Sequence, residues 1–332
     1  MPPAPTQDEP TEHDAPPALR STGLSKRYGA THALVDLDLE VARGEIFGFL
    51  GPNGAGKSTF IRLLLGFLHA SAGSARVLGH DVATESVAIR RRVGYLPSGA
   101  SLYGEMTGRR VLDYLASLQG RPPVRRAEAC DRLRLTADVL AKPVRTYSHG
   151  MRQKLGLVQA LQHDPELLIL DEPSEGLDPF MQQALYGLLE DLRREGRTVF
   201  FSSHVLSEVE RVCDRVAIVR AGRLMTVQDL PTLRARRRRR AIVRLRGPAP
   251  DLREVPGVEA VEVDGARMIV TLSGAVQPFV RAMADTELDD LTIEPARLEE
   301  AFFEYYAGGD ETAPGDEASP QPAAAAQGSA PR

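Results

Sequence analysis

Short runs of apolar residues, each followed by a polar or glycine-rich turn, recur in the N-terminal part of the chain at 45–50, 93–96, 167–170 and 198–201. Each run predicts a strand, and the four apolar residues at 167–170 are typical of a strand buried on both faces, as in a parallel sheet. A further strand is expected at 33–39. Helical spacing of apolar residues predicts helices at 60–65, 111–118, 127–135 and 151–161. The pattern therefore predicts an α/β domain that carries a helical insert.

The pattern changes towards the C-terminus, where we expect a small separate α+β module. A strand is expected to begin at 241–245, and a hairpin is expected from 258–263 and 268–272, joined by a turn at Asp264-Gly265. Two helices are expected, at 276–283 and 298–306. The module shows no catalytic constellation, so an accessory or dimerising role is expected for it.

The expected domain limits follow from these changes in pattern. The α/β domain spans 18–233, an arginine-rich linker spans 234–240, and the small module spans 241–306. The terminal segments 1–17 and 307–332 are rich in Pro, Ala, Gly and acidic residues, so disorder is expected there. The arginine run is expected to be a solvated hinge or, as an alternative, a contact for anionic lipid headgroups, where each basic residue contributes about 1 kcal/mol.

Composition narrows the possible functions. The chain has 332 residues and a formal net charge of −4, which gives no argument for binding nucleic acid. The sequence contains no apolar run long enough to span a bilayer, and Met1–Pro5 does not have the pattern of a secretory signal. Cys130 and Cys213 have no metal-type spacing and are expected to be small buried hydrophobes. A cytoplasmic location is expected.

A phosphate-binding loop follows the first apolar run and precedes a predicted helix. The sequence matches GxxxxGKS and consists of Gly51, Pro52, Asn53, Gly54, Ala55, Gly56, Lys57, Ser58 and Thr59. Glycines let the backbone wrap closely around an anion, so that its N–H groups point at phosphate oxygens. The lysine would reach the outer phosphates, the serine hydroxyl would bind Mg²⁺, and the helix N-terminus would add a positive dipole.

Two carboxylates and a histidine are expected at the same edge of the sheet as this loop. Asp171 and Glu172 follow the apolar run 167–170 directly, and His204 follows the run 198–201. The carboxyl ends of strands in α/β sheets are where ligands bind. We expect Asp171 to hold Mg²⁺, Glu172 to act as general base, and His204 to contact the γ-phosphate.

With these motifs in this order, residues 19–233 resemble the nucleotide-binding subunit of an ATP-binding cassette (ABC) transporter. The resemblance implies a P-loop cassette that has an antiparallel β-subdomain and a helical subdomain. It makes 51–59 the Walker A loop, 167–172 the Walker B strand with its catalytic glutamate, and His204 the switch histidine. It also implies that Tyr28 stacks on adenine and that Asp178 lies in the D-loop, Gly176-Leu177-Asp178.

The family signature, Leu-Ser-Gly-Gly-Gln, is only partly matched, by Tyr147-Ser148-His149-Gly150-Met151. Ser148 and Gly150 match, and a Ser-x-Gly core of this kind resembles drug-export and ABC-2-type exporter subunits. A second departure is Ser98, which stands where the family has a glutamine that contacts Mg²⁺ and faces the membrane partner.

The resemblance implies an ATPase that works as a head-to-tail dimer. Each ATP, with Mg²⁺, would lie between the phosphate loop of one cassette and Ser148 and Gly150 of the other. The chain has one cassette, so it would need a second copy or a related cassette, and a separate transmembrane permease at the cytoplasmic face of the membrane. Drug or antibiotic efflux is the implied transport, and no nucleic-acid partner is expected.

Two other functions stay open as alternatives. A soluble ABC ATPase acting on ribosomes or DNA is disfavoured, because the first type carries two cassettes and the second inserts a long coiled coil between the Walker motifs. A regulator that binds nucleotide without hydrolysis is disfavoured by the intact Lys57, Asp171, Glu172 and His204.

Overall fold

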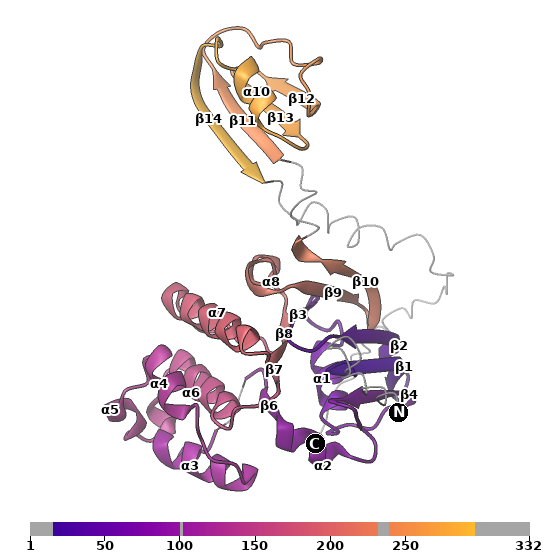
Figure 1. The fold of residues 1–332 in the computed structure, drawn as a ribbon, viewed down its shortest axis with the longest axis vertical. Helices are drawn as coiled ribbons and strands as arrows, with labels where there is room; N and C mark the ends of the chain where they lie inside the picture. Colours follow the sequence, from indigo (N-terminus) through magenta and orange to yellow (C-terminus); the bar gives the residue numbers. More distant parts are fainter. Residues whose placement is uncertain (1–15, 100–101, 232–238, 296–332) are drawn as a thin grey trace, which may run out of the picture. The chain divides into compact units, whose positions relative to one another are not determined.

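The computed structural model describes residues 16–99, 102–231 and 239–295 (Figure 1). The expected terminal segment 1–17, apart from its last two residues, lies outside this part of the chain, as do the helix expected at 298–306, the tail from 307 and most of the arginine run. Among the helices of the described residues, none is long and apolar enough to cross a membrane.

A six-stranded sheet forms the centre of the cassette, with the strand order β10-β9-β3-β8-β7-β6. Its strands are β3 (Ile46–Leu50), β6 (Val93–Leu96), β7 (Leu167–Asp171), β8 (Thr198–Ser203), β9 (Arg215–Arg220) and β10 (Arg223–Asp229). All neighbouring pairs are parallel except β9 with β10. Every residue of β3, β7 and β8 is buried, which confirms the prediction of a strand covered on both faces at 167–170.

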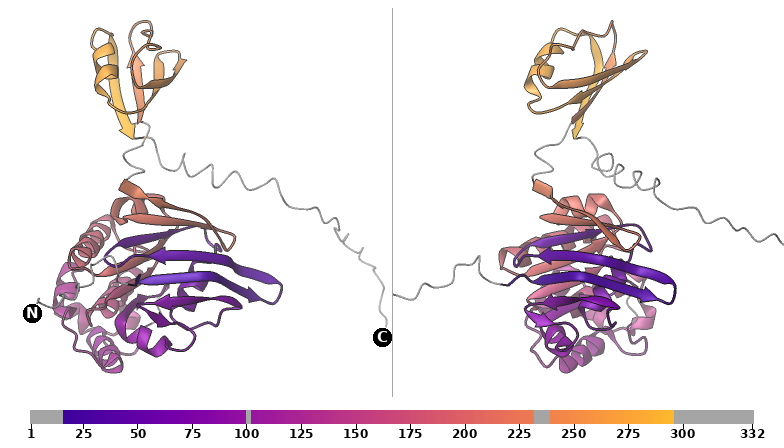
Figure 2. Two further views of the ribbon diagram at one scale, coloured as in Figure 1. Left: turned by 45° about the vertical axis from the view of Figure 1, so that its right-hand side comes forward. Right: turned by 90° about the vertical axis from the view of Figure 1, so that its right-hand side faces the viewer.

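An antiparallel sheet packs on the other side of helix α1 (Lys57–Leu64), with the order β2-β1-β4-β5. Its strands are β1 (Leu19–Tyr28), β2 (Thr31–Val41), β4 (Ala72–Val77) and β5 (His80–Asp81). The long indigo strands β1 and β2 lie side by side in both views of Figure 2. Phe47, Phe49, Phe60 and Phe200 stack on one another and join the central sheet to α1.

Helices form the remainder of the cassette. Those next to the central sheet are α2 (Ser86–Arg92), α7 (Pro179–Arg194) and α8 (Leu206–Val212), and the helical subdomain contains α3 (Gly108–Gln119), α4 (Arg126–Arg132), α5 (Ala137–Leu140), the 3-10 helix η2 (Val144–Thr146) and α6 (His149–Leu161). Side chains cap several of them: Thr107, Ser148 and Asp178 accept hydrogen bonds from the first turns of α3, α6 and α7. The α/β cassette with antiparallel and helical subdomains is therefore confirmed.

Within residues 239–295, the C-terminal module contains a four-stranded antiparallel sheet with the order β12-β13-β11-β14 and the helix α10 (Gln277–Ala282). Its strands are β11 (Arg239–Leu245), β12 (Val258–Asp264), β13 (Arg267–Leu272) and β14 (Leu288–Pro295). Ala241, Val243, Met268, Val270 and Phe279 form its core. The hairpin and the first helix were predicted, β14 was not, and β11 begins within the expected linker. The limits of the domains stay a prediction.

Candidate active site

The phosphate loop connects β3 to α1, and its lysine folds back over it. Lys57 is 7 % exposed, and its Nζ donates to the carbonyl oxygens of Gly51 at 2.7 Å and Pro52 at 3.3 Å. Two glycines of the loop have no room for a side chain. A Cβ on Gly51 would lie 2.4 Å from the carbonyl oxygen of Val219, and Gly56 has a φ of 100°. The loop is therefore held close to the sheet, with the N-terminus of α1 behind it.

Asp171 ends β7 with its carboxylate held by two hydroxyl groups. The side chain is 2 % exposed; its Oδ2 accepts from Ser58 Oγ at 2.7 Å and its Oδ1 accepts from Ser202 Oγ at 2.5 Å. Ser202 is the neighbour of Asp171 in the parallel ladder between β7 and β8. The structure thus brings together Ser58 and Asp171, the two residues expected to bind the metal.

Glu172 lies directly after β7 in a left-handed backbone conformation, with a φ of 51°. Such a φ is uncommon for a residue other than glycine and is found at constrained positions. Its N–H donates to the carbonyl oxygen of Ser202 at 3.2 Å. The carboxylate contacts His204 Nδ1 at 2.8 Å through Oε2 and forms an ion pair with Lys57 Nζ at 3.2 Å through Oε1. The expected base and the switch histidine are therefore in direct contact.

Lys57, Ser58, Asp171 and Glu172 line one open cleft with a volume of about 310 Å³. Its lining includes residues of the phosphate loop, Asp171 and Glu172, together with Ser98 and the start of β2 at Thr31, His32 and Ala33. Tyr28 pairs with Thr31 at the end of the β1–β2 hairpin, is 47 % exposed, and has the ammonium group of Lys26 5.1 Å from its ring centre. Tyr28 thus lies on the hairpin that borders the cleft.

The remaining predicted residues lie outside this cleft. Ser148 caps α6 by accepting from Met151 N at 3.2 Å, and Asp178 caps α7 by accepting from Met181 N at 3.0 Å. The two turns pack against each other, because a Cβ on Gly150 would be 2.5 Å from the carbonyl oxygen of Gly176. The signature turn and the D-loop of one chain are therefore in contact with each other and not with its own phosphate loop.

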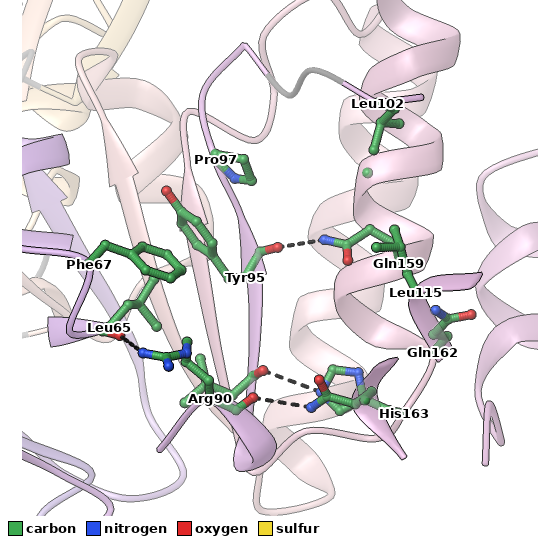
Figure 3. Close-up of a pocket in the computed structure, with 13 residues that line it drawn as sticks. Leu65, Phe67, Arg90, Tyr95, Pro97, Leu102, Leu115, Gln159, Gln162 and His163 are labelled. Carbon is green, nitrogen blue, oxygen red and sulfur yellow. Dashed lines mark hydrogen bonds between the residues drawn. The ribbon is translucent and has the colours of Figure 1, made fainter. Parts of the chain in front are cut away.

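A second cavity, of about 290 Å³, lies between the β6 edge and helices α3 and α6 (Figure 3). Gln159 Nε2 donates to the carbonyl oxygen of Tyr95 at 2.6 Å, and Arg90 donates to that of Leu65 at 2.8 Å. Burial, helped by the charge of Asp171, raises the pKa of Tyr95 to about 12. Pro97 lines this groove while the next residue, Ser98, lines the cleft, so one short segment borders both.

Sequence reasoning missed two residues that touch the site. Ser202 bonds to Asp171 as described, and Gln153 of α6 bonds to the main chain at Glu172 and Pro173. Ser202 and Ser203 stand at the end of the predicted strand just before His204. Their hydroxyls could therefore have been predicted to lie at the same edge of the sheet as the carboxylates. Nothing in the helical pattern around Gln153 indicated its contact. Cys213 is buried as expected, whereas Cys130 is half-buried.

Comparison with known proteins gives the family of the chain. The family model described as ABC transporter matches residues 34–175. Daunorubicin resistance ATP-binding protein DrrA3 of Streptomyces coeruleorubidus is 36 % identical over 86 % of this chain and 95 % of its own length. The bacitracin transport ATP-binding protein BcrA of Bacillus licheniformis is 36 % identical over 67 % of this chain and 72 % of its own length. A solved ATP-binding subunit of an ABC transporter is 32 % identical, with a TM-score of 0.61 over 65 % of this chain and 92 % of its own.

A phosphate loop after β3 of a parallel sheet, with Asp171 and Glu172 at the same edge at the end of β7, defines a P-loop ATPase that binds ATP. Within that class, the chain belongs to the family of ABC transporter ATP-binding proteins.

Proposed function

We propose that this chain hydrolyses ATP in a head-to-tail dimer of cassettes and thereby drives export through a separate permease. The observation that carries the proposal is the convergence of Lys57, Ser58, Asp171 and Glu172 on one cleft, with His204 bound to the carboxylate of Glu172. Phosphoryl transfer depends on positioning and on charge stabilisation, and these residues supply both.

Glu172 has the geometry of a general base. Its Oε2 is held by His204 and its Oε1 faces Lys57, so the carboxylate is fixed at the phosphate loop. When ATP binds, we expect Lys57 to exchange its contact with Glu172 for phosphate oxygens. Oε1 is then free to accept a proton from the attacking water, and His204 keeps the carboxylate oriented.

The residues present also fit Mg²⁺. Ser58 Oγ and Asp171 Oδ2 are hard oxygen donors 2.7 Å apart at the mouth of the loop. Within the described residues no group of three or more His, Cys, Asp or Glu side chains forms a metal cage. This suits an ion that keeps phosphate and water ligands. Bound there, Mg²⁺ would neutralise charge on the transferred phosphoryl group.

The second cavity, beside β6, is the proposed contact site for the permease. It borders the nucleotide cleft through Pro97 and Ser98, so a protein seated in it would sense changes at the cleft. Exposed aromatic side chains continue the apolar surface next to it: Tyr103 is 54 % exposed, and its ring lies 5.5 Å from that of Tyr114. Contact there would place the chain at the cytoplasmic face of the membrane.

The cargo we propose is a drug or an antibiotic, since relatives of this chain carry daunorubicin resistance and bacitracin transport in their names. The alternative, a soluble ATPase acting on ribosomes or DNA, predicts no membrane partner. Co-purification of the tagged chain from detergent-solubilised membranes separates the two. Recovery of a polytopic membrane protein supports the proposal, and recovery of ribosomes or DNA contradicts it.

The catalytic assignment is tested with Glu172→Gln. We expect this variant to bind ATP normally, to hydrolyse it about 10²- to 10⁴-fold more slowly, and to accumulate as an ATP-bound dimer, because the amide cannot accept the proton. Hydrolysis at the wild-type rate would show that Glu172 is not the base.

The shared site is tested by mixing two inactive variants. Ser148→Arg removes the signature hydroxyl, and Lys57→Ala removes the charge at the phosphates. Alone, each should be inactive; mixed, one of the two sites of a heterodimer pairs an intact loop with an intact Ser148. Heterodimers without any recovered activity would contradict a site shared between two chains.

A further inference from the structure

Gln153 is a buried side chain that connects the signature helix to the main chain of the catalytic glutamate. It lies on α6, five residues after the cap Ser148, and is 3 % exposed. Its Nε2 donates to two successive carbonyl oxygens, that of Glu172 at 3.1 Å and that of Pro173 at 3.0 Å. A single side-chain amide thus holds the backbone on the C-terminal side of Glu172.

The backbone of Glu172 needs such support. Its φ of 51° is a sparsely populated conformation, which persists only where the surrounding structure fixes it. On the N-terminal side, the N–H of Glu172 is bound by Ser202 of β8. On the C-terminal side, the next residue is Pro173, which has no N–H to contribute, and the carbonyl oxygen of Glu172 accepts from the N–H of Glu175 at 3.2 Å in the turn that follows. Gln153 supplies donors to this side from a different element.

The position of this contact ties Glu172 to the movement of α6. Five helical residues span about 7.5 Å, and a helix moves as a unit over that length. A shift at Ser148, at the N-terminus of α6, therefore reaches Gln153 and the carbonyl oxygens that it binds. Gly150 of the same helix also packs against Gly176, so α6 contacts the turn that follows Glu172 at two points.

We propose that Gln153 is a positioning residue, which orients the carboxylate of Glu172 according to the position of α6. The inference rests on the proposed function, in which Glu172 is the base and the N-terminus of α6 meets ATP held by the partner cassette. Engagement of α6 at one ATP site would thereby align the base at the other site of the dimer.

Gln153→Met tests this in the full chain, because methionine has a similar volume and cannot donate. Thr198→Val is the matched control. Thr198 is 2 % exposed, and its hydroxyl accepts from the main chain of Gly44 at 3.0 Å, at the start of β8 and away from the cleft. Gln153→Met loses two hydrogen bonds to the main chain and Thr198→Val loses one, so both should lower the melting temperature.

Only Gln153→Met should lower kcat, by about 10- to 100-fold, with KM and the dissociation constant of a fluorescent ATP analogue within about threefold of wild type. Combined with Glu172→Gln, it should add no further loss, because a misplaced base and an absent base are equivalent. Wild-type kcat in Gln153→Met, an equal loss of kcat in Thr198→Val, or additive losses with Glu172→Gln would each overturn the inference.

If Gln153→Met does not fold, Gln153→Glu replaces it. A carboxyl group can donate to a carbonyl oxygen only when protonated, so kcat of this variant, relative to wild type, should rise as the pH falls from about 8 to about 6. A flat ratio would overturn the inference. If Glu172→Gln itself hydrolyses at the wild-type rate, the proposed function fails and the inference falls with it; if only the Gln153 variants keep the wild-type rate, the proposed function stands.

Discussion

Removing the hydroxyl of Ser202 should destabilise the cassette more than removing an equally buried hydroxyl elsewhere. Ser202 is 0 % exposed, and its Oγ donates at 2.5 Å to Asp171, whose carboxylate is itself 2 % exposed. In Ser202→Ala, Asp171 Oδ1 loses this donor and stays in a buried position. A buried acceptor without its donor bears its desolvation cost, and the cost is larger when the acceptor is charged.

The expected magnitude follows from the charge of the acceptor. Hydrogen bonds to charged groups contribute about 1.5–3 kcal/mol, whereas bonds between neutral groups contribute about 0.5–1.5 kcal/mol. Ser21 provides the neutral comparison: it is 4 % exposed, and its Oγ donates to the carbonyl oxygen of Leu37 at 2.9 Å. For a domain of this size, the loss in Ser202→Ala corresponds to a fall in melting temperature of about 3–12 °C.

Urea unfolding followed by circular dichroism at 222 nm measures the difference, because the chain has no tryptophan for fluorescence and most of the described helices belong to the cassette. The cost of Ser202→Ala should also shrink towards that of Ser21→Ala in an Asp171→Asn background, where the acceptor is neutral. If Ser202→Ala costs no more than Ser21→Ala, or costs the same in both backgrounds, the charge of Asp171 is not what Ser202 stabilises.

Three further predictions follow from other contacts. Ser98→Ala should slow hydrolysis less than about tenfold, because the short side chain of Ser98 only lines the cleft, whereas Lys57→Ala should abolish activity. Equal losses of the two variants in a steady-state ATPase assay would assign Ser98 a principal role. Burial lowers the pKa of His163 below its ordinary 6.5, so the unfolded chain takes up a proton first, and stability present above about pH 6.5 is lost as the pH falls towards the folded pKa. His163→Gln should therefore lose less stability than wild type over this range, and urea midpoints that change in parallel in the two proteins would contradict the reasoning. Gly94→Ala should lower the free energy of unfolding by about 3 kcal/mol, since its Cβ would lie 2.1 Å from the carbonyl oxygen of Ala160. Gly187→Ala, inside α7 with its nearest contact at 3.5 Å, should raise it by up to about 1 kcal/mol, and equal unfolding midpoints for the two variants would contradict the packing argument.

The local order of elements in the cassette could be predicted from the sequence because periodicity and turn chemistry are local. Fully apolar runs gave β3, β7 and β8, and helical spacing gave α3, α4 and α6 with small errors at their ends. β14 was missed, since acidic residues interrupt its apolar pattern, in which Leu288, Leu291 and Ile293 pack on the core of the module. Its strand character depends on its pairing with β11.

The candidate residues were also accessible from the sequence, because a phosphate loop and two carboxylates after a buried strand have few other uses. The contacts that these residues make could not be predicted from the sequence. Ser202 reaches Asp171 because β8 pairs with β7 and lies between β7 and β3, although β3 comes first in the chain. Gln153 reaches Glu172 because α6 packs over the end of β7.

The sequence by itself therefore determined which chemical groups the site contains, since each motif is a continuous stretch of chain. Only the tertiary structure decided which groups hold Asp171 and Glu172 in place, because those partners come from strands and helices distant in sequence. Their approach depends on strand order, on register, and on a left-handed turn at Glu172 that no local propensity favours.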